Sequence, residues 1–433
     1  MSNFYNKADE PTRRQFMLNA ARAYLGVHLF PMLGPTIASA AAEGAAKAAK
    51  AKHVIYLFMA GGMSHLDTFD PKPKKKDVMG PTETIPTKAD GVELSGYLPK
   101  TAEVTDKMCI INSLNSTQGA HEQGTYIMHT SYMPRGTIQH PSLGAWVMKL
   151  GGPLHPDLPG FVAVNAPPAN TGGGFFGARF SAAPIGHPDA GLQDSHRASA
   201  VSEGDFDRRL ALADRLNKQF HSRYPNADVK AYEELYQAAI SLMKSEDLVA
   251  FDLSKEDQET RELYGSGNFA QGCLLARRLI EHDVRFVEVQ LGGWDTHYDN
   301  FTGVAGRCAE FDQAYAALLT DLEKRGKLQD TLVVVATEFG RTPEIKKEHS
   351  NGRDHHPSAF SCVLAGGGVK GGIKYGQSDS TGAKVREGLM SVQDFNATIA
   401  YALGLPHDLV LMSPTKRPFK IADKGTPATS LFS

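Results

Sequence analysis

Apolar runs separated by glycine-containing polar segments predict a chain in which strands and helices alternate. The runs that predict buried strands are 53–60, 108–111, 161–164, 284–289, 331–337 and 360–365. In other stretches the apolar residues recur every three or four positions, which is the helical period. These predicted helices cover 121–132, 141–150, 308–322 and 392–403. The alternation predicts an α/β fold with a central, mostly parallel sheet flanked by helices.

The domain boundaries follow from changes in this pattern. Residues 205–282 show helical spacing without a strand, so we predict a helical insertion there. The α/β domain is expected to span 51–412, and 413–433 is expected to be an irregular tail. Within the domain, Ser391 and Asp394 are spaced as in a capping box that opens the last helix.

The first 50 residues are expected to be a signal peptide and linker. Thr12-Arg13-Arg14-Gln15-Phe16-Met17 resembles a twin-arginine export motif, and Ala38-Ser39-Ala40 offers a cleavage site. Charges and prolines interrupt the apolar stretch between them, so it does not predict an integral membrane protein. We therefore expect a periplasmic or secreted protein carried by the twin-arginine export machinery. A disordered cytosolic leader is the alternative.

The composition narrows the classes of partner. The hydrophobic content of 41% and charged content of 22% are ordinary for a globular protein. Lys and Arg total 46 against 48 for Asp and Glu, so no net field favours nucleic acid. The four cysteines are too scattered for a disulfide framework or a thiolate metal site. Cys109 and Cys362 lie in apolar runs and are expected to be buried thiols.

Polar segments beside three predicted strands carry metal-ligating side chains. Two glycines separate the strand 284–289 from Asp295 and His297, which face the same side if the backbone is extended. In an open α/β sheet, ligands bind beyond the carboxyl ends of the strands, where such residues converge. The candidate metal ligands from these segments are Asp295, His297, Glu338, Asp354, His355 and His356.

The first strand ends in the same way, with paired glycines followed by His65, Asp67 and Asp70 as further candidate ligands. Taken alone, His65 is better explained as a hydrogen-bonded histidine of a turn. Carboxylate and imidazole donors without thiolates favour zinc, with manganese or calcium as alternatives.

Not every candidate can bind the same ion. Asp354, His355 and His356 are adjacent, and side chains alternate in extended backbone, so at most two of them can be ligands. The third is expected to orient a ligand or to contact substrate. Arg341 and Arg353 are candidate catalytic residues that would hold a phosphate or sulfate group.

Five motifs of the chain resemble one bacterial family. They are Arg13-Arg14, 61–73, Gly293-Trp294-Asp295-Thr296-His297, 337–343 and Asp354-His355-His356-Pro357. The chain is identified as similar to a twin-arginine-exported family of unknown function in the alkaline phosphatase and sulfatase superfamily. The resemblance implies an α/β sheet whose metals are bridged by a Ser, Thr or modified Cys nucleophile.

The resemblance also implies roles for individual residues. Asp295 and His297 match an Asp and a His of the superfamily pattern, and His355 or His356 matches its last His. Glu338 keeps the carboxylate of an Asp-His-Gly turn, where Phe339 replaces the imidazole.

The nucleophile is implied to lie before the helix at 121, where Ser116 and Thr117 are available. No Cys-x-Pro-x-Arg is present, so a formylglycine sulfatase is not expected. The function expected from all of this is a metal-dependent hydrolase of phosphate or sulfate esters, acting on a small-molecule or glycan substrate. The alternative is a non-catalytic exported protein that binds a glycan or a protein.

Overall fold

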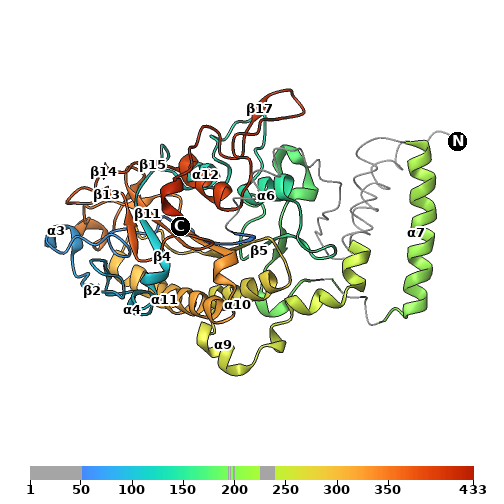
Figure 1. Cartoon of the computed structure of the whole chain (residues 1–433), viewed down its shortest axis with the longest axis horizontal. Coiled ribbons are helices and arrows are strands. Elements are labelled where there is room, and N and C mark those ends of the chain that lie inside the picture. The colour runs from blue at the N-terminus through green and yellow to red at the C-terminus, as the bar shows by residue number, and fades with distance from the viewer. Residues whose placement is uncertain (1–50, 194, 196, 198–199, 225–238) are drawn as a thin grey trace.

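The computed structural model describes residues 51–193, 195, 197, 200–224 and 239–433. A sheet lies at its centre between helices (Figure 1). This sheet has nine strands in the order β12-β4-β11-β8-β1-β7-β5-β6, and β15 also pairs with β4. The strands are β1 (His53–Met59), β4 (Met108–Asn115), β5 (Phe161–Val164), β6 (Ala183–Ile185), β7 (Phe286–Leu291), β8 (Thr331–Ala336), β11 (Phe360–Gly366), β12 (Ile373–Tyr375) and β15 (Met390–Ser391). All pairs are parallel except the two made by β11. The predicted mostly parallel sheet is confirmed.

Helices cover both faces of this sheet. One face packs on α10 (Asn268–Glu281) and α11 (Asn300–Lys324), and the other packs on α5 (His121–Thr130), α6 (Leu143–Gly151) and α12 (Val392–Ala402). Successive residues of β1 enter the two cores alternately, with Tyr56 on one side and Leu57 on the other. A strand buried on both faces is apolar at every position, which explains why these strands read as continuous apolar runs.

Side-chain caps explain where two of the helices begin. Ser391 Oγ accepts a hydrogen bond from Asp394 N at 3.1 Å, and Asp394 Oδ2 accepts one from Ser391 N at 3.0 Å. The predicted capping box is therefore confirmed. The helix predicted from 141 begins instead at Leu143, because Ser142 Oγ accepts a hydrogen bond from Ala145 N.

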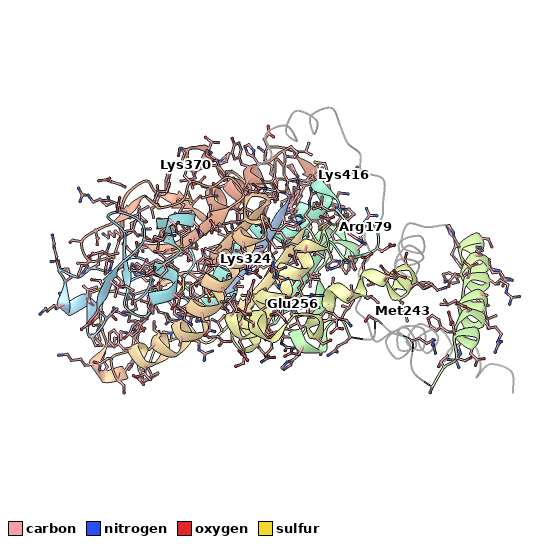
Figure 2. The ribbon with its side chains drawn as sticks, turned by 60° about the horizontal axis from the view of Figure 1, so that its bottom comes forward. Arg179, Met243, Glu256, Lys324, Lys370 and Lys416 are labelled. Atoms are coloured by element: carbon pink, nitrogen blue, oxygen red, sulfur yellow. The ribbon has the colours of Figure 1, made fainter. Side chains whose placement is uncertain are left out.

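The described part of the predicted helical insertion divides into two kinds of helix. α7 (Glu203–Arg223) lies at one end of the molecule in both overall views, and none of its residues is buried (Figure 2). α10, in contrast, packs against β7 and α11.

Other α-helices of the described residues are short: α3 (Lys76–Met79) and α4 (Pro99–Ala102) precede the insertion, and α9 (Gln258–Tyr264) lies within it. Within the described ranges, no helix combines the length and hydropathy needed to cross a bilayer.

The predicted tail, 413–433, is described by the structure, whereas the predicted leader is not. The predicted leader, 1–50, lies outside the described residues. Within 413–433, β17 (Pro418–Phe419) pairs with β16 (Leu411–Met412), and Phe419, Ile421 and Leu431 are buried in the core. All four cysteines are buried free thiols, as predicted for two of them.

Strand direction brings five loops to one edge of the sheet. β1, β7 and β8 are parallel and end there. β11 runs antiparallel to β8, so β11 begins at that edge, and β4 runs antiparallel to β11, so β4 ends there. The segments after β1, β4, β7 and β8 and the segment before β11 therefore meet.

Candidate metal centre

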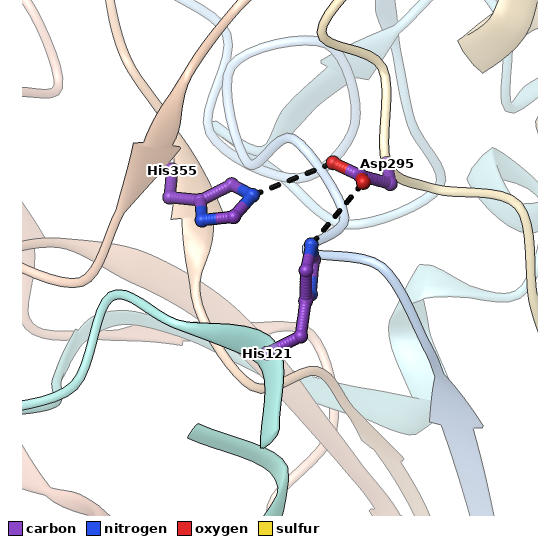
Figure 3. A group of neighbouring side chains, drawn as sticks. All are labelled: His121, Asp295 and His355. Atoms are coloured by element: carbon purple, nitrogen blue, oxygen red, sulfur yellow. Dashed lines mark hydrogen bonds and ion pairs between the residues drawn. The ribbon is translucent and has the colours of Figure 1, made fainter. Parts of the chain in front are cut away.

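Asp295, which follows β7, is surrounded by the imidazoles of three histidines. Its Oδ2 lies 3.3 Å from His121 Nε2, and its Oδ1 lies 3.3 Å from His297 Nε2 and 3.4 Å from His355 Nε2. Figure 3 shows His121 and His355 directed at this carboxylate from two different segments. Donor atoms of His121, Asp295 and His355 all lie within 4.8 Å of one another. The Asp295 side chain is 47% exposed, so the cluster opens to solvent.

The other ring nitrogens of two of these histidines are held by carboxylates. His121 Nδ1 lies 2.7 Å from Glu338 Oε1, and His297 Nδ1 lies 3.1 Å from Asp354 Oδ1. A carboxylate accepts hydrogen bonds, so each Nδ1 carries the hydrogen and the neutral ring keeps its lone pair on Nε2. Metal-binding histidines are commonly oriented in this way.

His355 is held by a main-chain carbonyl instead. Its Nδ1 lies 2.6 Å from the oxygen of Gly119, which also leaves Nε2 directed at the cluster. That Nε2 lies 2.9 Å from His297 Nε2. Burial lowers the pKa of His355, and the positive charge of Arg341 lowers it further against the opposing hydrogen bond to Gly119.

Nε2 of His121 is the least satisfied atom of the cluster. It is buried and makes no hydrogen bond to any described residue, although the Asp295 carboxylate lies 3.3 Å away. The hydrogen bond with Glu338 raises the pKa of His121 against the effect of burial, and Asp295 raises it further. His121 Nε2 therefore faces the Asp295 carboxylate either with a lone pair, when the ring is neutral, or with a proton, when the ring is charged.

Glycines allow the segments to approach this closely. Gly61, directly after β1, has a φ of +116°, and a Cβ on it would lie 2.5 Å from Asp295 N. A Cβ on Gly352 would lie 1.6 Å from the oxygen of His297. Any side chain at either position would push apart the loops that carry the cluster.

Arg341 binds the Asp295 carboxylate from the buried side of the cluster. Its guanidinium is fully buried and donates to Asp295 Oδ1 at 2.5 Å, to Gly62 O at 2.9 Å, to Arg353 O at 3.0 Å and to Gly61 O. Burial raises the pKa of Asp295, but Arg341, together with the nearby His121 and His297, outweighs burial and lowers that pKa to about 2. Arg341 therefore keeps Asp295 ionised and in place, and each of its three nitrogens already donates a hydrogen bond.

His65 and His356 form a separate pair away from the cluster. Their rings are stacked with centroids 6.2 Å apart. His65 Nε2 lies 2.9 Å from Gly382 O, and His356 Nε2 lies 2.7 Å from Ala383 O. Burial lowers the pKa of His65 to about 3. Of the three adjacent candidates, the structure therefore places His355 in the cluster, Asp354 behind His297 and His356 on the opposite side.

Asp67 and Arg353 form a buried ion pair that is also separate from the cluster. Arg353 Nε lies 3.0 Å from Asp67 Oδ2, and both side chains are fully buried. Asn300 Nδ2 donates to the same oxygen at 3.0 Å. Asp70 pairs with Lys72 at 2.8 Å. The contacts of Asp67 join the segment after β1 to the rest of the fold, the pair of Asp70 and Lys72 lies within that segment, and neither carboxylate is bonded to the cluster around Asp295.

Ser116 and Thr117 lie in the loop that leads to the cluster. Ser116 Oγ accepts a hydrogen bond from Gln118 N, and Thr117 Oγ1 accepts one from Gln118 Nε2, each at 3.2 Å. The same loop continues through Gly119, whose carbonyl contacts His355. Neither hydroxyl bonds to a residue of the cluster.

His121 is a candidate ligand that the motifs of the sequence did not predict. Residue 121 was predicted only to begin a helix, with the nucleophile expected in the segment before it. The available signal was the same one that identified Asp295: a polar, potentially ligating side chain shortly after an apolar strand, here β4.

The chain belongs to the DUF1501 family, described as a protein of unknown function, whose model matches residues 51–432. No curated protein matches the chain. Among solved structures, it is similar to the lipoteichoic acid synthase LtaP from Listeria monocytogenes, with 10% identity, a TM-score of 0.40 and coverage of 94% of this chain and 80% of that chain.

Two further solved structures show similarity at the same level. The PsFucS1 sulfatase from Pseudoalteromonas sp. has 13% identity, a TM-score of 0.41 and coverage of 88% and 75%. The C-terminal periplasmic domain of EcEptC from Escherichia coli, in complex with Zn, has 9% identity, a TM-score of 0.40 and coverage of 84% and 85%. Similarity this low carries no statement about activity.

Proposed function

We propose that this member of the DUF1501 family is an exported, metal-dependent hydrolase of phosphate or sulfate esters. The observation that carries the proposal is the convergence of three imidazole Nε2 atoms on one carboxylate, each with its Nδ1 bonded to an acceptor. When the three rings are neutral, the Nε2 atoms and the carboxylate oxygens are all acceptors, so they face one another with no hydrogen between them. Such an arrangement is suited to a cation.

Zinc is the metal that the donor set favours. Nitrogen from His121, His297 and His355 with oxygen from Asp295 is a typical zinc donor set, whereas calcium takes oxygen donors almost entirely. Manganese remains the alternative. Bound there, the metal would polarise the ester oxygen and lower the pKa of an attacking water or hydroxyl.

The residues behind the cluster would maintain its geometry during turnover. Glu338 and Asp354 fix the ring orientations of His121 and His297, and Arg341 holds Asp295 as an anion. The opening of the cluster to solvent is compatible with a small-molecule ester or with an ester group on a glycan. Ser116 or Thr117 would serve as the nucleophile if a side chain attacks, because their loop borders the site.

Export is the second part of the proposal, and it rests on Arg13 and Arg14. Replacing both with Lys should leave the full-length precursor in the cytoplasm, whereas the unaltered chain should be found in the periplasm or medium. Fractionation of a bacterial host followed by immunoblotting measures this. Equal export of both forms would show that the paired arginines are not an export signal.

The decisive experiment is the metal content of the purified chain, measured by mass spectrometry. The unaltered protein should hold about one equivalent of zinc or manganese, and Asp295→Ala/His297→Ala should hold none. Asp247→Ala/His282→Ala is the matched control, because it also removes one Asp and one His from a neighbouring pair, 3.8 Å apart on the surface. No metal in the unaltered protein, even after metal is supplied, would refute the metal centre.

Turnover is tested with aryl phosphates and aryl sulfates in the presence of zinc or manganese. Hydrolysis that is lost in Asp295→Ala/His297→Ala and retained in the control pair is the expected result. The non-catalytic alternative is favoured by one observation, that the hydroxyls of Ser116 and Thr117 bond to Gln118 and not to the cluster. A protein that binds the metal and hydrolyses none of the esters would support that alternative.

A further inference from the structure

A buried contact joins the helix that carries His121 to the strand that leads to Asp295. His129, in the last turn of α5, places its Nε2 3.0 Å from Oε1 of Glu288 in β7. The two side chains are 3% and 2% exposed. Nothing in the proposed chemistry uses either of them, although a titratable pair is costly to bury.

The bonding around His129 requires a proton between the two groups. His129 Nδ1 lies 2.8 Å from the carbonyl oxygen of Thr125, which can only accept, so Nδ1 carries a hydrogen. Nε2 faces a carboxylate oxygen, and two acceptors cannot share a 3.0 Å contact without a hydrogen between them. The pair is therefore joined by a single strong hydrogen bond, whichever group holds the proton.

Aromatic side chains from β1 fix the position of this ring. The His129 ring meets Phe58 edge-on with centroids 4.5 Å apart, and Tyr56 lies 5.8 Å away. β1 lies between β7 and β8 in the sheet. These contacts, with the bond of Nδ1 to Thr125 O, oppose rotation of the imidazole away from Glu288.

This contact gives α5 a second attachment to the central sheet. At its first residue, His121 bonds to Glu338, which follows β8, and near its last residue His129 bonds to Glu288. The two attachments are about 12 Å apart along the axis, at 1.5 Å per residue. A helix fixed near both ends can neither slide along the sheet nor rotate about its axis without breaking one of them.

We propose that His129 and Glu288 are positioning residues for the metal centre, because their bond sets the axial position of α5 and so holds His121 Nε2 against Asp295. The inference rests on the proposed metal centre. It assigns a role to two residues that lie outside that centre and contact no ligand.

The test is zinc affinity and the visible spectrum of the cobalt(II)-substituted protein. The main variant is His129→Phe/Glu288→Leu, because replacing both buried polar partners with apolar groups leaves neither one unpaired. Glu288→Gln is the conservative variant, since its amide can still bond to His129. Tyr264→Phe is the control. It removes a buried hydrogen bond between Tyr264 in α9 and Asp321 in α11, and neither residue lies in α5 or β7.

The double variant should bind zinc about tenfold or more weakly, the size of effect seen for residues that orient metal ligands. Its cobalt spectrum should change, while Glu288→Gln and Tyr264→Phe should match the unaltered protein in both. Circular dichroism confirms that each protein is folded. Unchanged affinity and spectrum in the folded double variant would overturn the inference. Absence of metal from the unaltered protein would instead refute the proposed function on which it rests.

If the double variant does not fold, the single variant Glu288→Gln is measured together with His129→Gln. His129→Gln can still bond to Glu288 but lacks the ring held between Phe58 and Thr125. Weaker zinc binding and a changed cobalt spectrum in His129→Gln, with normal values in Glu288→Gln, would support the positioning role. Normal values in both would overturn it.

Discussion

The Nε2 atoms of His297 and His355 face each other across 2.9 Å, and each ring is bonded to another group through its Nδ1. Asp354 and the Gly119 carbonyl hold the opposite nitrogens as donors, so the facing atoms are both acceptors when the rings are neutral. Two facing lone pairs repel. A proton or a metal cation between the rings and Asp295 removes that repulsion.

Zinc should therefore stabilise the folded protein. At a free concentration one hundred times its dissociation constant, a ligand that binds only the folded state adds about 2.7 kcal/mol. We expect the melting temperature to rise with added zinc and to fall with a chelator. Calcium should produce no comparable rise, because the site is rich in nitrogen. A melting temperature unaffected by zinc would contradict the prediction.

Glu338→Ala should weaken zinc binding by about 10- to 100-fold, the usual cost of removing a group that orients a metal-binding histidine. His121 loses the acceptor of its Nδ1 hydrogen, and Gly61 N loses an acceptor at 2.9 Å. Competition with a chromophoric chelator measures the affinity. Glu338→Gln is the companion variant and should bind more tightly than Glu338→Ala, since its amide oxygen can still accept.

Zinc binding should also depend on pH in a defined direction. His121 has a pKa above its ordinary value of 6.5, chiefly because of Glu338, and it must lose its proton before Nε2 can bind a metal. The affinity should therefore fall as the pH is lowered through this raised pKa. In Glu338→Gln the fall should begin at lower pH. Titrations at several pH values test this, and an identical profile for both proteins would contradict it.

Arg353 should matter for stability and not for metal binding. Removing one partner of a fully buried ion pair leaves the other charge uncompensated and typically costs about 3–5 kcal/mol. Arg353→Met leaves Asp67 in that state. Denaturant unfolding should show the loss, while the folded variant should keep normal zinc affinity. A large loss of zinc affinity in the folded variant would show that Arg353 contributes to metal binding and would contradict the prediction.

His65 should make the protein sensitive to acid. Burial lowers its folded-state pKa to about 3, against an ordinary value of 6.5, so between these values the unfolded state binds more protons. The contribution of His65 to the free energy of unfolding is fully present above pH 6.5. It is lost as the pH falls toward 3, by up to about 1.4 kcal/mol per pH unit. His65→Phe should flatten this dependence in unfolding experiments, at the cost of the hydrogen bond to Gly382. An equally steep dependence would assign the effect to another group.

The sequence was sufficient for six of the nine strands of the central sheet, and it placed Asp295 among the candidate ligands, but it did not indicate β6, β12 or β15. Strands buried on both faces are long apolar runs, and β1, β7 and β8 were identified from that property alone. Asp295 and His297 were found because glycines and polar residues directly follow such a strand. The capping box at Ser391 could be predicted from the sequence because its hydrogen bonds join residues only three positions apart.

The direction of β11 could not be read from the sequence. A run of apolar residues has the same composition in parallel and antiparallel strands. Because β11 is antiparallel to β8, the segment before it, and not the one after it, reaches the edge where Asp295 lies. That direction brings His355 into the cluster.

Which candidates lie in the cluster around Asp295, which lie behind it and which contact the core was likewise decided by the tertiary structure. The sequence by itself determined that imidazoles and carboxylates lie beside the ends of apolar strands, because local periodicity specifies where strands begin and end. It could not distinguish His121 from His65, since each follows an apolar strand. Packing turns His121 toward Asp295 and buries His65 against Gly382, and this choice depends on neighbours 174 and 317 residues away in the sequence, which no local pattern records.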